Sequence, residues 1–387
     1  MTVVSGDGVS LTQALVRCDS RNPSLVAGAP AGGGGGEQRV AEVLRDALTS
    51  WGIACSLQQV APGRPNVVAK IPGSGGGRSL MFNGHLDTVD VTGMSHAPFD
   101  GTLSDGRIYG RGASDMKGGV AAMCAAGARL RGRLKGDLLI AAVMDEEWES
   151  HGTRALLREG HRTDAAIVTE PTRLRVMPAH KGFVWLEVEI HGRASHGSRW
   201  DIGVDAIRGA GLVLADLDRM DREELPARRH ALLGRPSLHA SLIEGGVGMS
   251  TYPERCLLKV ERRTLPGETS ADVIAQFEQC AARVRAARPE FAIAVRMTFA
   301  QPPSDVAPDS PIVEALASCV AEQGLDAGLE GMSAWTDAAL LNEAGIPAIC
   351  FGPGDMGLAH ADEEYIHADE IERATEILVA AAERWCN

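Results

Sequence analysis

The sequence lacks the features that mark membrane-spanning, exported or nucleic-acid-binding proteins. No apolar run approaches the roughly 20 residues that span a bilayer, and the N-terminal segment MTVVSGDGVSLTQAL has neither the basic leader nor the apolar core of a signal peptide. The formal net charge is -13 at pH 7, whereas nucleic acids and anionic membranes favour an excess of Lys and Arg. We therefore expect a cytoplasmic protein with neither nucleic acid nor membrane as its main partner, although a local Arg could hold an anionic small molecule.

Paired cysteines and a phosphate-binding loop are also absent. The eight cysteines are scattered without a C-x-x-C pair, and Cys350 lies among apolar neighbours in IPAICFG, which is typical of a reducing compartment. The glycines of AGAPAGGGGGEQ, residues 27–38, are not followed by the Lys-Ser or Lys-Thr of a phosphate-binding loop. We interpret this segment as a mobile loop before a helix that begins near Glu37.

The composition is that of an ordinary globular chain. Its 387 residues, 44% hydrophobic and 23% charged, suffice for about two or three domains with full cores. In the first part of the chain, helices are predicted near 37–51 and 117–131, and strands near 53–60, 66–71, 79–84, 137–144 and 165–168. This combination predicts an α/β fold with a mixed sheet.

From residue 181 the pattern changes to that of a smaller domain. The strand KGFVWLEVEIHG is followed by a helix at about 203–220, strands at about 236–243 and 255–264, a helix at about 270–287 and a strand at 291–299. This βαββαβ order is typical of a ferredoxin-like domain. After the proline-rich connector QPPSDVAPDSP, a helix, the strand IPAICFG and a final helix from about 368 to 385 resume the α/β pattern. We therefore predict a larger α/β domain, residues 1–178 and 300–387, interrupted by a ferredoxin-like domain of residues 179–299.

One apolar run ends in three consecutive acids. LLIAAVMDEEWESHG, residues 138–152, fits a buried strand whose end emerges at the carboxyl edge of the sheet, where α/β proteins build their sites. Asp145, Glu146 and Glu147 repel one another, and Trp148 follows them where a surface turn would have Lys or Arg. On its own, this segment fits either a functional site or a solvated turn.

Other polar residues close apolar segments in the same way. His85 and Asp87 in SLMFNGHLDTVD share one face of a strand, and a metal-bound imidazole usually donates its second N–H to such a carboxylate. A structural His–Asp pair is the alternative. Asp115 in YGRGASDMKGG, Glu170 in AAIVTEPT and His360 in GPGDMGLAHADEEY stand at comparable positions. Imidazole mixed with carboxylates suits zinc, or manganese or cobalt, and the number of carboxylates indicates two metals with a shared ligand.

An ordered set of motifs makes the chain resemble a known family from about residue 10 to its end. GHLDTV, GRGASDMKGG, DEE, TEPT, GRASHGS and AHADEEY occur in the order found in co-catalytic zinc amidohydrolases. These are aminoacylase-like enzymes such as acetylornithine deacetylase, succinyl-diaminopimelate desuccinylase and glutamate carboxypeptidase. Each motif is weak alone, but the ordered set is highly specific.

The resemblance implies a role for each residue of the set. His85 and Glu170 hold one metal, Glu147 and His360 hold the other, and Asp115 bridges them. Asp87 is the partner of His85, Glu146 is the general base, and Asp145 has a structural role at the strand end. In an extended chain Glu146 and Glu147 would point opposite ways, so a bend must bring both toward the metals. The resemblance also implies a cis peptide between Asp115 and Met116.

The activity implied is metal-dependent hydrolysis of the amide bond of an N-acylated amino acid or analogue. A water shared by two divalent ions loses its proton near neutral pH, and Glu146 would take that proton and pass it to the leaving amine. A carboxypeptidase or dipeptidase of the same family is one alternative. A non-catalytic relative that keeps the fold as a binding module is another, although such a relative would usually have lost a ligand or Glu146.

The smaller domain contributes two further candidates. In dimeric relatives, the histidine that His196 of ASHGS resembles reaches the site of the other subunit and donates to the developing oxyanion. We therefore expect a homodimer through residues 180–298. Arg263 in VERRTLPGE matches the position that holds a substrate carboxylate, but Arg262 beside it faces the other way and a one-residue slip would exchange them. Ser250 and Trp200 depart from the usual Asn and Pro, which leaves the acyl group open.

Overall fold

The computed structural model describes residues 3–26 and 36–387. Most of the glycine-rich loop predicted at 27–38 lies outside these residues. The chain forms two compact units, one of residues 1–178, 306–330 and 336–387, the other of residues 179–305 and 331–335. Each unit contains its own sheet and helices, so the predicted α/β fold class is confirmed.

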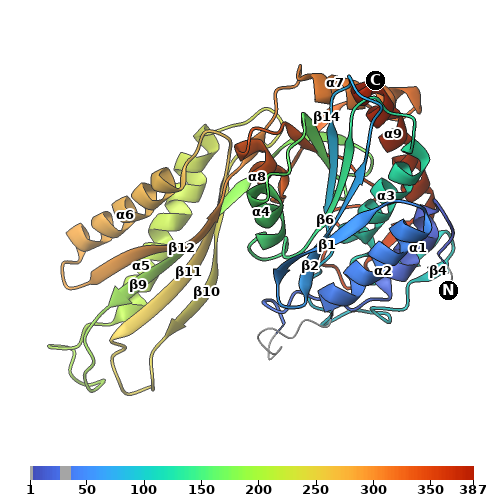
Figure 1. Ribbon diagram of the computed structural model, residues 1–387. Coiled ribbons are helices and arrows are strands. Elements are labelled where there is room, and N and C mark those ends of the chain that lie inside the picture. The colour runs from blue at the N-terminus through green and yellow to red at the C-terminus, as the bar shows by residue number, and fades with distance from the viewer. Residues whose placement is uncertain (1–2, 27–35) are drawn as a thin grey trace. The chain divides into compact units, whose positions relative to one another are not determined.

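The first unit is built on a mixed sheet with helices on both faces (Figure 1). Its strands follow the order β1-β2-β6-β3-β7-β15-β8, with parallel pairing from β6 to β15 and antiparallel pairing outside that range. These strands are β1 (Cys55–Ala61), β2 (Arg64–Ile71), β3 (Leu80–His85), β6 (Leu138–Val143), β7 (Ala165–Val168), β8 (Val176–His180) and β15 (Ala348–Cys350). Every residue of β3, β6 and β7 is buried, which explains their nearly continuous apolar runs.

Helices of different lengths cover this sheet, and a small antiparallel sheet lies beside it. The helices are α1 (Gly8–Val16), α2 (Gly36–Ser50), α3 (Gly118–Leu130), α4 (His151–Arg158), α7 (Pro311–Glu322), α8 (Ala338–Glu343) and α9 (Ala368–Cys386). The small sheet contains β4 (Thr102–Ser104), β5 (Arg107–Tyr109) and β16 (Tyr365–His367). Among the described residues, no helix is both long enough and apolar enough to cross a membrane. All eight cysteines are free thiols.

The second unit has the predicted βαββαβ order. Its elements are β9 (Gly182–His191), α5 (Ala206–Arg219), β10 (Ser237–Gly245), β11 (Arg255–Thr264), α6 (Ser270–Ala287) and β12 (Ala292–Gln301). Short turns η2 (Met220–Glu224) and η3 (Leu225–Ala227) follow α5, and β13 (Ser304–Asp305) and β14 (Leu329–Met332) are short strands. The sheet order β10-β11-β9-β12 is antiparallel throughout, as in a ferredoxin-like fold.

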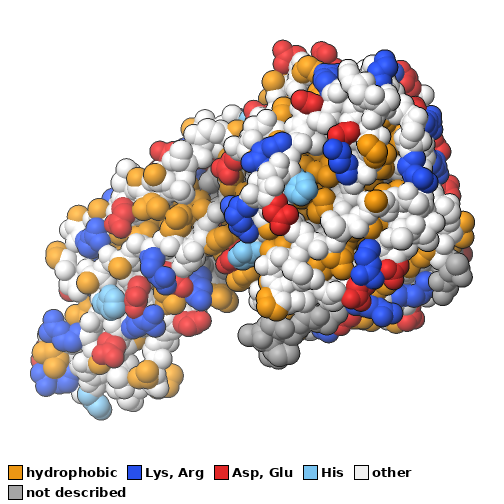
Figure 2. All heavy atoms as spheres, in the orientation of Figure 1, with side chains coloured by type: hydrophobic (Ala, Val, Ile, Leu, Met, Phe, Trp, Pro, Cys, Tyr) orange, Lys and Arg blue, Asp and Glu red, His pale blue; other side chains and the backbone are white. Residues whose placement is uncertain are grey.

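Strict alternation along β9 assigns the two faces of this sheet. Leu186, Val188 and Ile190 are buried in the core that α5 and α6 complete, whereas Glu187 and Glu189 point to the opposite face and pair with arginines there. On the side of the molecule shown in Figure 2, acidic and basic side chains are interspersed over the surface of this unit. The use of this unit for dimerisation stays a prediction.

Candidate metal centre

The predicted ligands of the first unit come from segments that end at one edge of the sheet. His85 is the last residue of β3, Glu147 follows β6, and Glu170 follows β7. These three strands are parallel, so their carboxyl ends lie together. Asp115 lies in the turn η1 (Ala113–Lys117) before α3, and His360 lies in the loop before β16.

The main chain has the two unusual conformations expected from the sequence, one in the loop of Glu146 and Glu147 and one in the turn of Asp115. Asp145 has φ 68°, in the left-handed region, which breaks the strand alternation before Glu146 and Glu147. The Asp115–Met116 peptide is cis, as the resemblance implies.

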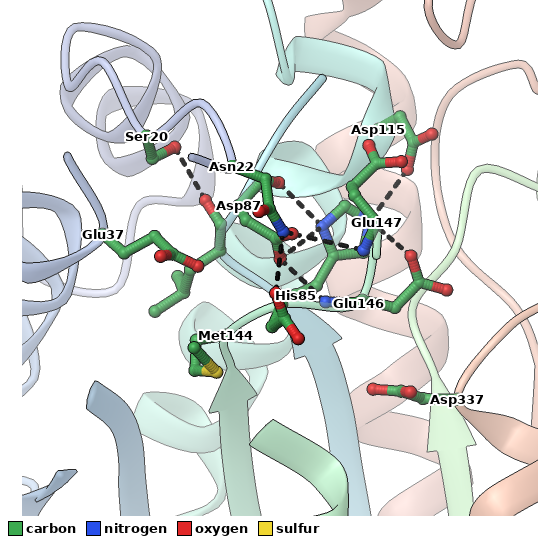
Figure 3. A network of polar contacts seen from close by, with 12 residues as sticks. Ser20, Asn22, Glu37, His85, Asp87, Asp115, Met144, Glu146, Glu147 and Asp337 are labelled. Atoms are coloured by element: carbon green, nitrogen blue, oxygen red, sulfur yellow. Dashed lines mark hydrogen bonds and ion pairs between the residues drawn. The ribbon is translucent and has the colours of Figure 1, made fainter. Parts of the chain in front are cut away.

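Asp115 directs one carboxylate oxygen toward each histidine. Its Oδ1 lies 3.0 Å from His85 Nε2, and its Oδ2 lies 3.5 Å from His360 Nε2. Glu147 approaches His360 from the other side, with Oε2 at 3.1 Å from Nε2. Ligand atoms of His85, Asp115 and Glu147 all lie within 4.8 Å of one another, and Figure 3 shows these side chains converging. A carboxylate with its oxygens divided in this way has the arrangement of a bridging ligand.

The partner of His85 differs from the expected one. His85 Nδ1 lies 2.9 Å from the main-chain carbonyl oxygen of Asp87, while the nearest carboxylate oxygen of Asp87 is 3.8 Å away. The expectation that the carboxylate receives this N–H is therefore wrong, because the main chain of the same residue is closer. The carbonyl accepts the Nδ1–H, and Nε2 faces Asp115. Burial opposes a charge on His85, but the hydrogen bond to Asp115 and the charge of Glu146 outweigh it and hold the pKa of His85 well above its usual value.

The carboxylate of Asp87 instead holds the loop of the two glutamates. Its Oδ1 accepts the main-chain N–H of Glu146 at 3.0 Å, and its Oδ2 accepts that of Glu147 at 3.2 Å. Asn22 Nδ2 donates to the same carboxylate at 2.8 Å. Asp87 is fully buried and burial raises its pKa to about 6, so these donors are what stabilise its charge.

Asn22 links Asp87 to a second buried acid. Its Nδ2 also donates to Asp145 Oδ1 at 3.0 Å, an oxygen that accepts from Arg64 Nη2 at 2.8 Å, and Arg64 pairs in turn with Glu37. Burial opposes ionisation of Asp145, but hydrogen bonds from His151 and Asn22 outweigh it and hold its pKa below the usual value. Asp145 has the structural role expected of it.

Sequence reasoning missed Asn22 and Arg64 as parts of the site. Asn22 lies some sixty residues before its partner in the chain, in a loop without periodicity, and Arg64 opens a strand that is mostly buried and shows no alternation to mark its polar contacts. The one available signal was electrostatic, since buried acids at a strand end need nearby donors.

The site contains more carboxylates than its histidines could neutralise. Burial raises the pKa of Glu146 well above the usual value, and the charge of Glu170 adds to the shift. Burial also raises the pKa of Glu170, reinforced by Asp115. Asp337, the residue before α8, is buried as well, and burial raises its pKa to about 6. Glu170 Oε1 and Asp337 Oδ1 are both buried without a hydrogen-bond partner among the described residues.

These features fit divalent cations. His85 Nε2 and Asp115 Oδ1 lie 3.0 Å apart, a separation that a shared proton bridges and that a divalent cation could bridge in its place. Zinc bonds of about 2.0 to 2.2 Å to nitrogen and oxygen bring neighbouring ligand atoms close to this separation. The unpartnered oxygen of Glu170 and the mutual repulsion of the acids point the same way.

His196 and Arg263 belong to the second unit. The imidazole of His196 is exposed, and its Nδ1 accepts the main-chain N–H of Ser198 at 3.2 Å, which leaves Nε2–H as the free donor. Arg263 is partly exposed and lies over the Phe183 ring at 5.3 Å, with Nε bonded to Glu261 at 2.6 Å. Arg262 is fully buried and paired with Glu268. Of the two arginines, Arg263 is therefore the one that a ligand can reach.

Ser250 and Trp200, the two positions at which this sequence differs from the family that it resembles, lie on exposed loops of the second unit. Ser250 is exposed beside the His196 segment, its carbonyl accepting the N–H of Gly197 at 2.7 Å. The Trp200 side chain is 82% exposed. Neither residue has a packing role that would explain its identity.

Comparison with known families agrees with this arrangement. Residues 81–384 match the sequence profile of Peptidase family M20/M25/M40. The chain belongs to this family. It is 32% identical over 326 residues to the acetylornithine deacetylase of Myxococcus xanthus, with 83% of this chain and 84% of that protein covered. It is 28% identical over 373 residues to a Bacillus subtilis deformylase acting on N-formyl-4-amino-5-aminomethyl-2-methylpyrimidine, with 88% and 87% covered.

Solved structures of the family share the fold. Aminopeptidase PepT from Bacillus cereus superposes with a TM-score of 0.78 over 100% of both chains at 20% identity. The Bacillus subtilis protein YxeP, described as a dinuclear metal-binding peptidase of family M20, superposes with a TM-score of 0.73 over 97% of this chain and 96% of that one, at 16% identity. Members of the M20/M25/M40 family are hydrolases, and this chain is a hydrolase of the same family.

We expect Asn22→Ala to lower turnover at least about tenfold with little change in KM. The variant removes donors from two buried carboxylates, and hydrogen bonds to charged groups are worth about 1.5 to 3 kcal/mol each. Asp87 would then hold the loop of Glu146 and Glu147 less firmly. Steady-state kinetics and chemical denaturation measure the two effects.

The control is Gln13→Ala, which removes a buried amide that donates to the main chain of Gly101 at 2.8 Å, outside the cluster. It should lower the unfolding free energy without changing turnover per folded molecule. Equal turnover in the two folded variants would show that Asn22 does not act on the site.

Proposed function

We propose that the protein hydrolyses the amide bond of an N-acylated amino acid or a close analogue, using two divalent metal ions. The observation that carries the proposal is the division of the Asp115 carboxylate between His85 and His360. Zinc is the first candidate, with cobalt or manganese able to replace it, because imidazole and carboxylate ligands suit all three.

Five residues would hold the metals. His85 and Glu170 would bind one ion, Glu147 and His360 the other, and Asp115 both. Such ions lower the pKa of water and polarise a carbonyl oxygen. The unpartnered oxygen of Glu170 and the orientation of His85 Nε2 toward Asp115 support this distribution.

Glu146 is the proposed general base. Its side chain is 10% exposed, and its Oε2 lies 4.0 Å from His85 Nε2, so it borders the ligands without the close approach that Asp115 makes. The loop places its main-chain N–H on Asp87, which orients the side chain. A glutamate with a pKa raised by burial can accept a proton from water and return it to the leaving amine.

The substrate is proposed to be small and acylated. The curated relatives include a deacetylase and a deformylase, both of which remove a small acyl group from nitrogen. Carboxypeptidase or dipeptidase activity is the alternative, since peptidases share the fold. A non-catalytic role is disfavoured because the ligand set and Glu146 are all present.

Two residues of the second unit complete the proposal. Arg263 would hold the carboxylate of the substrate, since it is the accessible member of its pair. His196 would donate from Nε2 to the developing oxyanion in the site of a partner subunit, within a homodimer formed through residues 180–298. Exposed Leu242 and Ile243 on the edge strand β10 are compatible with such an interface.

Glu146→Gln should retain both metals and lose at least about a hundredfold in turnover, the usual scale for removing a general base. Metal content is measured by elemental analysis, and turnover on a panel of N-acetyl, N-succinyl, N-formyl and dipeptide substrates. Glu149→Gln is the matched control, because the carboxylate of this nearby acid lies 3.5 Å from His151 Nε2 and is not one of the proposed metal ligands. Near-normal turnover of Glu146→Gln with both metals bound would contradict the assignment of Glu146 as the general base.

Arg263→Met should raise KM for a carboxylate-bearing substrate at least about tenfold with a smaller effect on turnover, because a charge-assisted bidentate contact is lost. Arg262→Met should act mainly on stability, since it removes a fully buried guanidinium that pairs with Glu268, which then keeps only Arg228 as an ionic partner among the described residues. Kinetics and thermal unfolding of both variants separate the two outcomes. A higher KM for Arg262→Met, with mainly a loss of stability for Arg263→Met, would identify Arg262 as the substrate contact instead.

Mixing Glu146→Gln chains with His196→Ala chains should restore activity. Each homodimer would be inactive, but a mixed dimer would contain one site with an intact Glu146 from one chain and an intact His196 from the other. Subunit exchange is verified by mass spectrometry of tagged chains. An inactive mixture with confirmed exchange, or an active monomer, would contradict the cross-subunit role.

A further inference from the structure

Glu364 is a fully buried acid in the first unit that none of the assigned roles uses. It lies four residues after His360 and immediately before β16. The antiparallel pairing of β16 with β5 places Tyr365 opposite Tyr109, and so brings Glu364 beside the segment that runs from Gly110 to Asp115. Two segments separated by some 250 residues in the sequence meet here through their side chains and main chains.

Both oxygens of Glu364 are saturated by donors from that segment. Oε1 accepts the main-chain N–H groups of Ser114 at 2.9 Å and Asp115 at 3.1 Å. Oε2 accepts the N–H of Gly112 at 3.0 Å and Nη1 of Arg111 at 2.8 Å. One carboxylate thus satisfies three main-chain amides in the turn that presents Asp115, and these amides would otherwise be buried without partners.

The contact extends to the loop of His360. Arg111 Nη1 also donates to the carbonyl of Ala361 at 3.2 Å, the residue after His360, and Arg111 Nε donates to the carbonyl of Asp90 at 2.9 Å. The carbonyl of Glu364 accepts the N–H of Gly110 at 3.2 Å. The turn of Asp115 and the loop of His360 are therefore joined at several points, through main-chain groups and neighbouring side chains and not through the Asp115 carboxylate or the His360 imidazole.

We propose that Glu364 is a positioning residue that fixes the Asp115 turn against the His360 loop, and thereby sets the geometry in which Asp115 can bind two metal ions. The inference rests on the proposed metal-dependent function. It assigns to Glu364 a contribution to metal affinity through the main chain of another residue, without contact to metal or substrate.

Asp115 is the residue for which such positioning matters most. Its oxygens lie 3.0 Å and 3.5 Å from different histidines, so a small rotation of the turn would bring one oxygen closer and move the other away. A ligand that serves one ion tolerates such a rotation better than one that serves two. The amide of Asp115 itself is bonded to Glu364, which places the restraint one residue from the Cβ that carries the carboxylate.

Glu364→Gln tests this inference because it keeps the size of the side chain. The amide –NH2 would replace one oxygen and face either two main-chain N–H groups or one N–H group and the Arg111 guanidinium, so that donors meet donors. Substitutions that disturb the groups orienting metal ligands typically cost 10- to 100-fold in metal affinity or activity. We expect at least about a tenfold weaker affinity for the more weakly bound of two metal ions.

The metal-free protein is titrated with Zn²⁺ and with Co²⁺. Calorimetry measures the affinities, and the absorption spectrum monitors the Co²⁺ titration. Glu363→Gln is the matched control, since Glu363 is the exposed neighbour of Glu364 and should leave both affinities unchanged. Glu364→Asp keeps two acceptor oxygens on a shorter side chain, and its affinity should fall between those of the wild type and Glu364→Gln.

The outcomes distinguish this inference from the proposed function. A wild-type protein that binds no metal contradicts the proposed function itself. A wild-type protein with two sites and a folded Glu364→Gln variant with the same two affinities and the same Co²⁺ spectrum overturns the role of Glu364 alone. If Glu364→Gln does not fold, Glu364→Asp replaces it, since its shorter side chain cannot reach all three main-chain donors in the same way. Weaker binding of the second ion supports the inference, and unchanged binding overturns it.

Discussion

The structure of the first unit depends on buried carboxylates that accept hydrogen bonds from main-chain amides. Asp87, two residues after His85, accepts the amides of Glu146 and Glu147. Glu364, four residues after His360, accepts those of Ser114 and Asp115. Each histidine is thus followed closely by an acid that restrains a loop bearing a different ligand. The loops at the sheet edge have little regular structure of their own, so these cross-links replace the ladder of hydrogen bonds that holds a strand.

This arrangement also concentrates negative charge where water is largely excluded. Burial raises the pKa of all four acids Asp87, Glu364, Glu146 and Glu170. Asp87 and Glu364 accept hydrogen bonds from amides and from Asn22 or Arg111, which favour their charged forms. Glu146 and Glu170 lack an equivalent set of donors, and they are the acids proposed to lie beside or to hold the metal ions.

Sequence reasoning succeeded where a pattern has a single physical cause. The apolar runs of β3, β6 and β7 follow from burial on both faces, and the bounds of α6 follow from an apolar stripe with a capping box at Thr269 and Asp272. It missed α1 and the short α4 and α8, whose periodicity covers too few turns to stand out, and the small sheet of β4, β5 and β16.

For the site, residue types identified candidates but not contacts. The histidine and carboxylate candidates of the first unit could be chosen because each closes an apolar segment, whereas the partner of His85 turned out to be a main-chain carbonyl, which no side-chain pattern records. Asn22, Arg64 and Glu364 act through hydrogen bonds between distant segments, so only the folded chain reveals them. Burial likewise distinguishes Arg262, which is buried, from Arg263, which is partly exposed. Strand alternation alone could only place the two side chains on opposite faces.

The interrupted order of the first unit has a consequence for its synthesis on the ribosome. Strand β15 lies between β7 and β8, yet it is translated about 170 residues after them, once the whole second unit has emerged. Until then the nascent sheet has a gap with two open strand edges, and the half-made centre has His85, Asp115, Glu147 and Glu170 without His360 or Glu364. The complete set of proposed ligands therefore exists only after His360 has been made, and a chain released before residue 348 has a sheet with two open strand edges.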